Sequence, residues 1–354
     1  MSASTQRGRA RLGDNRLGFG SPFPTVTTVG SEPEGARRGR VVRVERGSVL
    51  VQVDGWVEPV SRGTEGLLVG DWVLVGGDRP GAPAVLEVER RRTLLGRGTA
   101  DRSSGEQGLA ANVDIVVVVE PFDPQPSLGR IERLLVLAWA SGAVPLVVLT
   151  KADLGHDSAS VVAEVTRASP GITVLAVSAQ SGSGMDDLRA MIGSGQTFVL
   201  VGPSGAGKST LVNALAGQSL MATAEVRGDG RGRHATSHRQ LVEMSDGSTL
   251  IDTPGLRSVG LTGDLEAVDD AFPEIGDVAA TCRFRDCQHD SEPGCAVMAA
   301  VDDDRLSARR VESWRKLRRE AAWQERRNNK QAQRAADRER GRQYERRRRG
   351  HVEY

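Results

Sequence analysis

The segment VGPSGAGKST, residues 201–210, decides the fold of the central part of this chain. It follows the apolar run TFVL at 197–200 and matches the pattern G-x-x-x-x-G-K-[ST] in full. A glycine-rich turn between a strand and a helix lets backbone N–H groups face phosphates, and its lysine adds a positive charge. The segment therefore predicts a phosphate-binding loop. The residues expected to contact a nucleotide there are Gly202, Pro203, Ser204, Gly205, Ala206, Gly207, Lys208, Ser209 and Thr210.

Strand and helix patterns alternate around this loop. The run VDIVVVVE at 113–120 is continuously apolar, which is typical of a strand buried on both faces of a parallel sheet. Alternation of such runs with helical patterns predicts a doubly wound α/β domain. Further strands are expected at 144–150, 172–179, 197–202 and 248–255, and helices at 128–138, 158–168, 184–192 and 208–217.

Thr150-Lys151-Ala152-Asp153 ends the apolar run at 146–149. One carboxylate can accept both N1–H and the 2-amino group of guanine, a donor pair that adenine lacks. Asp153 would carry this selectivity, and the stem of Lys151 would lie over the base. GTPases mostly have Asn where Thr150 stands, so the anchoring role of that position stays open. Alone, the segment could equally be the N-cap of a helix.

A second segment, Ser178-Ala179-Gln180, follows the next apolar run and strengthens the guanine interpretation. In GTPases such a segment backs the base with main-chain N–H groups. Here both base-reading segments precede the phosphate loop, whereas the phosphate loop ordinarily comes first. A domain whose termini lie close together tolerates such a rearrangement, so we expect a circularly permuted GTPase domain.

Two further clusters suggest metal ions. Asp252-Thr253-Pro254-Gly255 ends a strand pattern, where Asp252 could hold Mg²⁺ through water and the Gly255 N–H could meet the γ-phosphate. Ser209 of the phosphate loop would offer Mg²⁺ an oxygen. All 3 cysteines lie in the other cluster, where three thiolates and one imidazole would form a closed structural zinc site. Its ligands would be Cys282, Cys287, His289 and Cys295; the alternative is three buried thiols and a surface histidine.

The N-terminal part has a different character. Residues 1–35 resemble a disordered leader, and short β-branched runs separated by turn signals follow it. The runs expected to form strands lie at 40–44, 48–53, 66–75 and 84–91. These runs suggest a small closed barrel, either OB-like or SH3-like. We expect an OB-like barrel at 36–98, the permuted GTPase domain at 99–268, a mainly helical zinc-binding domain at 269–325 and an Arg-rich tail at 326–354.

Charge is unevenly distributed along the chain. Residues 305–349 hold 18 Lys/Arg against 6 Asp/Glu, although the whole chain has a net charge of only +1. A basic tail on an otherwise acidic protein suggests a polyanionic partner such as RNA, or else a solvated tail with no partner. We find no signal-peptide pattern and no apolar run of ~18 residues, and we expect a cytoplasmic protein without a membrane span.

The permuted motif order, the phosphate loop and CRFRDCQHDSEPGCAV at 282–297 together resemble the ribosome small-subunit-dependent GTPase A family. The resemblance implies binding of GTP and Mg²⁺, one structural Zn²⁺, and hydrolysis stimulated by the small ribosomal subunit late in its assembly. It also implies contacts of the barrel and the zinc domain with rRNA; we expect a monomer. By position in the family pattern, Thr236 takes a Mg²⁺ role and His234 is the catalytic candidate beside Lys208.

The catalytic assignment leaves alternatives open. Leu256 follows the Asp-x-x-Gly segment, where many GTPases carry a water-orienting Gln. His234 could orient the water instead, or it could be a solvent-exposed loop histidine. The rival functions are a non-catalytic RNA-binding protein that holds GTP as a structural ligand, and a P-loop ATPase with a coincidental TKAD segment.

Overall fold

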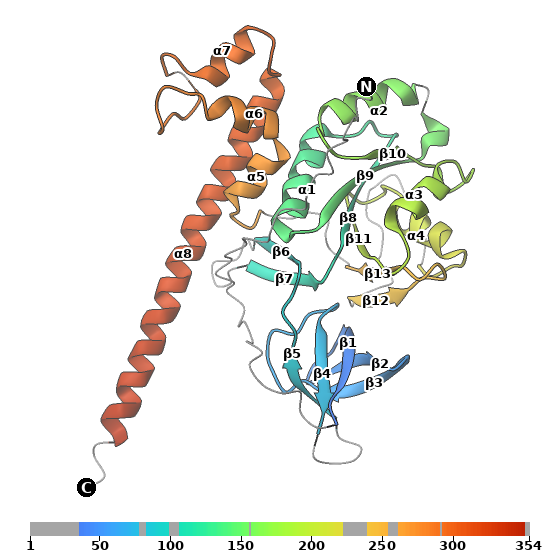
Figure 1. The fold of residues 1–354 in the computed structure, drawn as a ribbon, viewed down its shortest axis with the longest axis vertical. Coiled ribbons are helices and arrows are strands. Elements are labelled where there is room, and N and C mark those ends of the chain that lie inside the picture. The colour runs from blue at the N-terminus through green and yellow to red at the C-terminus, as the bar shows by residue number, and fades with distance from the viewer. Residues whose placement is uncertain are drawn as a thin grey trace, which may run out of the picture.

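The computed structural model describes three parts arranged around a central sheet (Figure 1): a small barrel, an α/β layer, and a helical region with one long helix. This confirms the predicted multidomain architecture. The described residues are 35–77, 83–98, 106–155, 157–221, 239–253, 261–290 and 292–350, with side chains described up to residue 330 in the last helix. The leader predicted at 1–35 lies, except for residue 35, outside these ranges.

The barrel closes in the strand order β1-β2-β3-β5-β4. Most neighbours pair antiparallel, while β3 and β5 pair parallel, which is the arrangement of a five-stranded Greek-key OB barrel rather than an SH3-like one. Valines that alternate along β2 fill its interior. The strands are β1 (Arg37–Val44), β2 (Ser48–Val53), β3 (Trp56–Ser61), β4 (Trp72–Gly76) and β5 (Ala84–Val88).

The central sheet has the order β10-β9-β8-β11-β13-β12. Its first five strands run parallel, and β12 pairs antiparallel at the edge. Every residue of β8 is buried, as its continuous apolar run predicts. The strands are β8 (Ile115–Pro121), β9 (Val144–Thr150), β10 (Val174–Ala176), β11 (Thr197–Val201), β12 (Gln240–Glu243) and β13 (Thr249–Asp252).

Helices cover both faces of this sheet. Val116 and Val118 of β8 face a core shared with α1 (Leu128–Ser141) and α2 (Ser158–Arg167). Val117 and Val119 alternate with these residues along the strand, so they point to the other face of the sheet and pack against α3 (Met185–Ile192) and α4 (Lys208–Ala216). The chain moves outward from β8 to β9 and β10, then returns to β11 on the other side. The connections therefore diverge between β8 and β11, where open α/β sheets bind ligands at the carboxyl ends of their strands.

A hairpin of β6 (Leu94–Gly98) and β7 (Glu106–Ala111) lies between barrel and sheet. Barrel and sheet also meet directly at Arg40, whose Nη2 donates to Thr197 Oγ1 at 2.8 Å. Burial lowers the pKa of the Arg40 guanidinium to about 10, although Asp114 opposes the shift. The polar contact therefore ties the barrel to the first residue of β11, the strand that leads into the phosphate loop.

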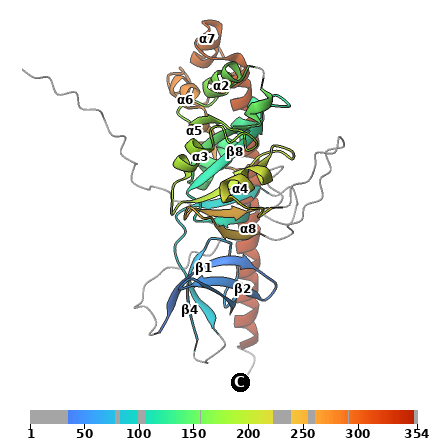
Figure 2. The same ribbon diagram turned by 90° about the vertical axis from the view of Figure 1, so that its right-hand side faces the viewer.

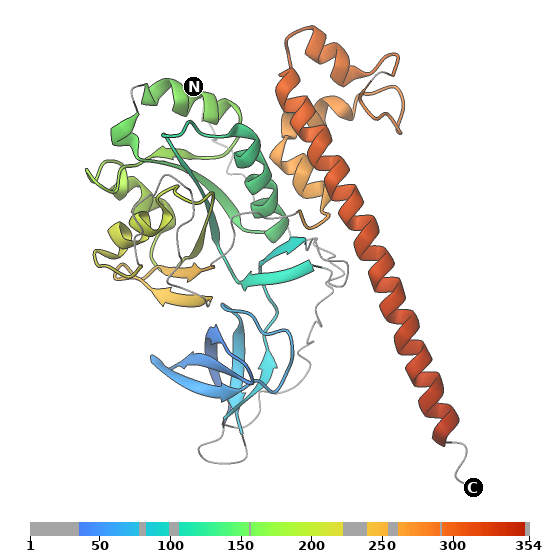
Figure 3. The ribbon, with the colours of Figure 1, turned by 180° about the vertical axis from the view of Figure 1, so that it is seen from behind.

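The helical region consists of α5 (Leu265–Ala271), α6 (Pro273–Ala279), α7 (Ala296–Asp302) and α8 (Ala308–Gly350), the last with 43 residues. Glu132 of α1 is fully buried and accepts hydrogen bonds from Arg309, Arg310 and Ser313 of α8. Contacts with the body continue as far as Asn328, whose amide donates to the carbonyl oxygen of Thr262 at 3.2 Å. Beyond it α8 extends as an arm (Figures 1 and 3), and the predicted boundary at 325/326 falls inside this continuous helix.

Figure 2 shows the same stacking from the side, with the barrel below the sheet and α8 running past both. No described helix combines the length and the hydrophobicity that crossing a membrane requires.

Candidate nucleotide site and metal centre

The phosphate-loop segment turns sharply between β11 and α4. Gly202 has φ +148°, and a Cβ there would lie 2.1 Å from the carbonyl oxygen of Val119, so only glycine fits against β8. Gly205 has φ +79°, and a Cβ there would meet no atom within 4 Å. The turn is therefore packed against the sheet on one side and open on the other. An open cradle of backbone N–H groups at a helix N-terminus suits a phosphate chain.

Lys208, the first residue of α4, folds back over this turn. Its Nζ donates to the carbonyl oxygens of Gly202 at 2.8 Å and of Pro203 at 2.6 Å. The ammonium group therefore lies within the cradle, where it can meet the anionic oxygens of a nucleotide. Ser209 beside it is half-buried, and Thr210 is exposed.

Thr150 joins the end of β9 to the phosphate loop. Its buried hydroxyl donates to the carbonyl oxygen of Ala206 at 2.6 Å, across 56 positions of sequence. The anchoring that the sequence left open at this position is thus made by a threonine hydroxyl. Because of this bond, the segment expected to read the base and the turn expected to hold phosphates share one edge of the sheet.

Asp153 and Ser178 meet at the same edge. Asp153 lies in the short 3₁₀ helix η1 (Ala152–Leu154) and accepts a hydrogen bond from the Ser178 hydroxyl. The Ala152 N–H also donates to the carbonyl oxygen of Val177 at 3.1 Å, which fixes the two loops together. Ala179 beside Ser178 is half-buried. The structure therefore brings the two predicted base-reading segments into contact.

Lys151 adopts the left-handed conformation, with φ +60°. Its Nζ donates to the carbonyl oxygen of Asp123 in the loop after β8, at 3.3 Å. Sequence reasoning missed Asp123, because a backbone carbonyl leaves no residue-specific signal. It also missed Glu120, a buried carboxylate at the end of β8 that pairs with Arg130 and so holds α1 to the strand. The sequence did offer one signal for Glu120, which is the single acidic residue near the end of an otherwise apolar strand.

Asp252 is the last residue of β13, which lies next to β11 and parallel to it, so this half-buried residue is at the same edge. Gly255, His234 and Thr236 lie outside the described residues, as does Leu256.

The four predicted zinc ligands gather at one point. The donor atoms of Cys282, Cys287, His289 and Cys295 all lie within 4.8 Å of one another. Cys282 Sγ lies 3.4 Å from His289 Nδ1 and 4.0 Å from Cys295 Sγ, and Cys295 Sγ lies 3.7 Å from His289 Nδ1. Tetrahedral zinc, with bonds of about 2.0–2.3 Å, separates its ligands by about 3.5–3.8 Å, so the donor set fits this ion.

Without a metal ion the ligands differ in their readiness to bind one, since burial raises the pKa of the Cys287 thiol to about 11 while the pKa values of His289 and Cys282 are lowered. Burial lowers the pKa of His289, which keeps its imidazole neutral and able to ligate. Burial raises the pKa of the Cys282 thiol, but hydrogen bonds from the backbone N–H groups of Ala296 and Val297 help to lower it by more, so the net shift is downward. The His289 ring also packs on Trp314 of α8, with centroids 5.2 Å apart. The metal centre is therefore joined to the long helix.

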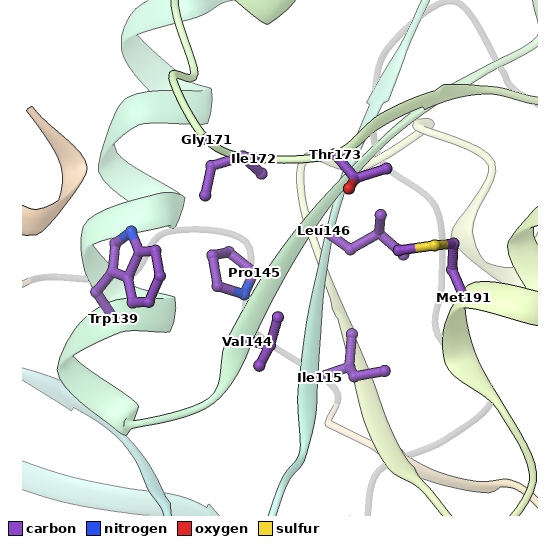
Figure 4. Close-up of a pocket in the computed structure, with 9 residues that line it drawn as sticks. All are labelled: Ile115, Trp139, Val144, Pro145, Leu146, Gly171, Ile172, Thr173 and Met191. Carbon is purple, nitrogen blue, oxygen red and sulfur yellow. The ribbon is translucent and has the colours of Figure 1, made fainter. Parts of the chain in front are cut away.

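A separate small cavity of about 130 Å³ opens at the opposite edge of the sheet (Figure 4). Ile115 and Val144, the first residues of β8 and β9, line it together with Trp139 and Met191. Its walls are mainly apolar, so it is not a phosphate site.

The elements predicted to read guanine and to bind phosphate thus converge at one sheet edge, while the predicted base segments come first in the chain. This combination defines a circularly permuted P-loop GTPase. Comparison with known proteins makes the class more specific. The RsgA GTPase family profile matches residues 88–262.

Relatives extend this match over most of the chain. A small ribosomal subunit biogenesis GTPase RsgA of Streptomyces coelicolor is 50% identical over 301 residues, covering 81% of each chain. One of Methanosarcina acetivorans is 40% identical, covering 73% of this chain and 70% of its own. This chain belongs to the RsgA GTPase family, and membership favours the hydrolase over the non-catalytic and ATPase alternatives.

Two solved structures share the fold. YjeQ from Thermotoga maritima superposes with a TM-score of 0.62 at 28% identity, covering 81% of this chain and 98% of its own. YloQ, described as a circularly permuted GTPase, superposes with a TM-score of 0.59 at 25% identity, covering 81% and 95%.

Proposed function

We propose that this protein is a GTP hydrolase that acts late in the assembly of the small ribosomal subunit, and that the subunit stimulates hydrolysis. The observation that carries the nucleotide part is the hydrogen bond from Thr150 to Ala206, because it fastens the base-reading edge to the phosphate loop. The ribosomal part rests on relatives named for small-subunit biogenesis. In this proposal the protein is a cytoplasmic monomer that contacts rRNA.

The proposed roles follow from the chemistry of the groups. Asp153 accepts the two adjacent donors of guanine, and its bond from Ser178 holds the carboxylate in place. The stem of Lys151 lies over the base plane, while Ala179 backs it with a main-chain N–H. Lys208 stabilises the negative charge of the β- and γ-phosphates, and the backbone N–H groups of residues 202–210 surround them.

Ion-binding roles are assigned on the same grounds. Ser209 and Asp252 would hold Mg²⁺, with Thr236 of the first switch region, and the Gly255 N–H would meet the γ-phosphate. Mg²⁺ supplies charge neutralisation between the phosphates when it is bound. His234 would orient the attacking water. Cys282, Cys287, His289 and Cys295 would hold Zn²⁺, which closes the loop between α6 and α7.

The test is the rate of GTP hydrolysis with and without purified small subunits, with large subunits as the control. We expect small subunits to raise the rate about tenfold or more, because a partner that orders a GTPase site accelerates hydrolysis there. A His234→Ala variant separates binding from chemistry: it should bind GTP normally and lose the stimulated rate. If small subunits do not change the wild-type rate, the ribosomal role is refuted. If the stimulated rate of His234→Ala equals that of the wild type, His234 is excluded from the mechanism.

A further inference from the structure

One face of α8 carries a row of exposed basic residues around a tryptophan. The row, here called the basic stripe, lies within one arc of the helix because its members are spaced by three and four residues. It points away from the face that Val311, Trp314, Leu317 and Ala321 bury against the body. The basic stripe consists of Lys316, Arg319, Trp323, Arg326 and Lys330.

Trp323 is the anomaly in this row. Its side chain is 54% exposed, whereas Trp314 on the opposite face is 1% exposed. The Arg327 guanidinium lies over the Trp323 ring at 5.3 Å from its centroid, so the ring belongs to a cationic surface and not to the core. A large exposed ring that the helix could have buried, but points outward, suggests a contact surface.

The cations of the basic stripe differ from those of the barrel. In the barrel, Arg37 pairs with Glu58, Arg38 with Glu89, and Arg91 with the buried Asp71. In the stripe, none of the four cations makes an ion pair or hydrogen bond with a described residue. Glu312, one turn earlier, bounds the row. Charge in the barrel is thus largely neutralised within the protein, while the charge of the basic stripe faces outward.

We propose that the basic stripe binds single-stranded RNA, with the Trp323 ring stacked on an unpaired base and the four cations against phosphates. This inference rests on the proposed ribosomal function and specifies one contact surface for it. Base–aromatic stacking and a cationic track are the two elements of single-strand recognition. Residues 316–330 span about 21 Å along the helix, which matches about six stacked nucleotides at about 3.4 Å each.

Other partners fit this surface less well. An acidic protein would pair with the cations but would not require a lone flat ring between them. An anionic membrane would require several apolar side chains on the same face, and the stripe has one. Apart from Trp323 the stripe is charged, unlike the apolar seam of a helix that pairs with a second copy. Only RNA uses every member of the row.

The experiment measures binding of the full chain to a fluorescent twelve-nucleotide oligoadenylate over a range of salt concentrations. Trp323→Ala should weaken binding about 5- to 100-fold, and Trp323→Phe should restore most of it. The matched control is Met191→Ala, because Met191 is a large apolar side chain that is 45% exposed on α3, outside the barrel, the helical region and α8. That variant should bind like the wild type.

Charge variants test the phosphate contacts separately. Each single change to Gln at Lys316, Arg319, Arg326 or Lys330 should reduce the slope of log affinity against log salt by about 0.7. Equal affinity of Trp323→Ala and wild type would overturn the proposal. So would equal losses in Trp323→Ala and Met191→Ala, or a preference for phosphatidylserine vesicles over the oligonucleotide.

Subunit-stimulated hydrolysis, measured on the same preparations, separates the two proposals. If small subunits stimulate the wild type but Trp323→Ala binds the oligonucleotide as tightly as the wild type does, only the proposal for the basic stripe fails. If small subunits do not stimulate the wild type, the ribosomal function fails whatever the oligonucleotide shows.

Discussion

The two candidate ligand sites of this protein are built in opposite ways. The proposed zinc ligands come from a single segment, Cys282 to Cys295, whose described residues between α6 and α7 form no helix or strand. The nucleotide site collects Asp153 and Lys208 from different strand ends, and they meet because β9, β8 and β11 are neighbours in a parallel sheet. A folded sheet thus creates the nucleotide site, whereas the metal would help to create the local fold around itself.

This difference predicts different consequences of damage. A lesion at the zinc centre should change the stability of the helical region and leave nucleotide affinity nearly intact. A lesion at the sheet edge should change nucleotide affinity and leave stability nearly intact. The main predictions below state the effect expected on each of the two quantities, so that a mixed result would contradict the comparison.

Removal of zinc should have the largest effect. Metal binding contributes about 10 kcal/mol or more to the folding of isolated zinc-finger peptides, and here it would close a loop without regular structure. We expect chelation to abolish hydrogen-exchange protection at 280–300 and to change GTP affinity by no more than about twofold, as for distant sites. The measurement is exchange by mass spectrometry together with zinc content.

The control for this experiment is the chelated protein to which zinc has been restored. Cys295→Ser should behave like the chelated sample, because Cys295 is the most buried of the ligands. Protection that survives full metal loss would show that the packing of Trp314 and its neighbours alone maintains this region.

Lys208→Ala should have the largest effect on the nucleotide side. Loss of a charged hydrogen-bond donor to the phosphates costs about 1.5–3 kcal/mol, or about 10- to 150-fold in GTP affinity. The unfolding midpoint without nucleotide should stay close to wild type. Lys316→Ala is the matched control, since it removes the same charge from the surface of α8. A large stability loss in Lys208→Ala would contradict the separation of the two sites.

Asp153→Asn should change base selectivity more than it changes stability. The amide can accept only one of the two guanine donors, but its N–H can donate to the 2-carbonyl of xanthine. GTP affinity should fall about 10- to 100-fold while xanthosine triphosphate gains affinity. Competition titrations of the two nucleotides measure this.

Asp157→Asn provides the matched control for the base-selectivity test. Asp157 caps α2 through the Ser160 N–H and lies four residues from Asp153. Its variant should keep wild-type preference, and a shared loss of selectivity would mean that the loop, not the carboxylate, reads the base.

The same contrast explains what the sequence could predict. Local patterns were sufficient to locate the turn between β11 and α4, the buried run of β8 and the Cys/His cluster, because each depends on neighbouring residues. The choice between OB and SH3 barrels depended on which strands pair, and the pairing of β3 with β5 is long-range. β3 itself was missed, since Pro59 and its exposed side chains obscure the alternation expected of a strand. β12 was missed as well; it has only four residues.

The site residues also differ in whether local sequence patterns could predict them. The sequence predicted Asp153 and Ser178 separately, but their contact depends on β9 lying beside β10. The buried Glu132 was not predicted, because its partners Arg309 and Arg310 are far along the chain and no local pattern links them. The roles assigned to His234, Thr236 and Gly255 stay predictions.

Thr150→Val should produce the smallest effect, and it tests the bond that joins the two halves of the nucleotide site. The change keeps the shape of the side chain but leaves the Ala206 carbonyl without its donor at 2.6 Å. An unsatisfied buried group costs about 1–3 kcal/mol, part of which should appear in stability and part as a loss of GTP affinity of about fivefold. Thr150→Ser keeps the hydroxyl and should resemble wild type in both. If Val and Ser variants are indistinguishable, the sheet alone positions the two loops, and the contrast with the metal centre is stronger than we infer. If the Val variant does not bind GTP, the nucleotide site depends on a single bond as the proposed zinc centre depends on its ion, and the contrast disappears.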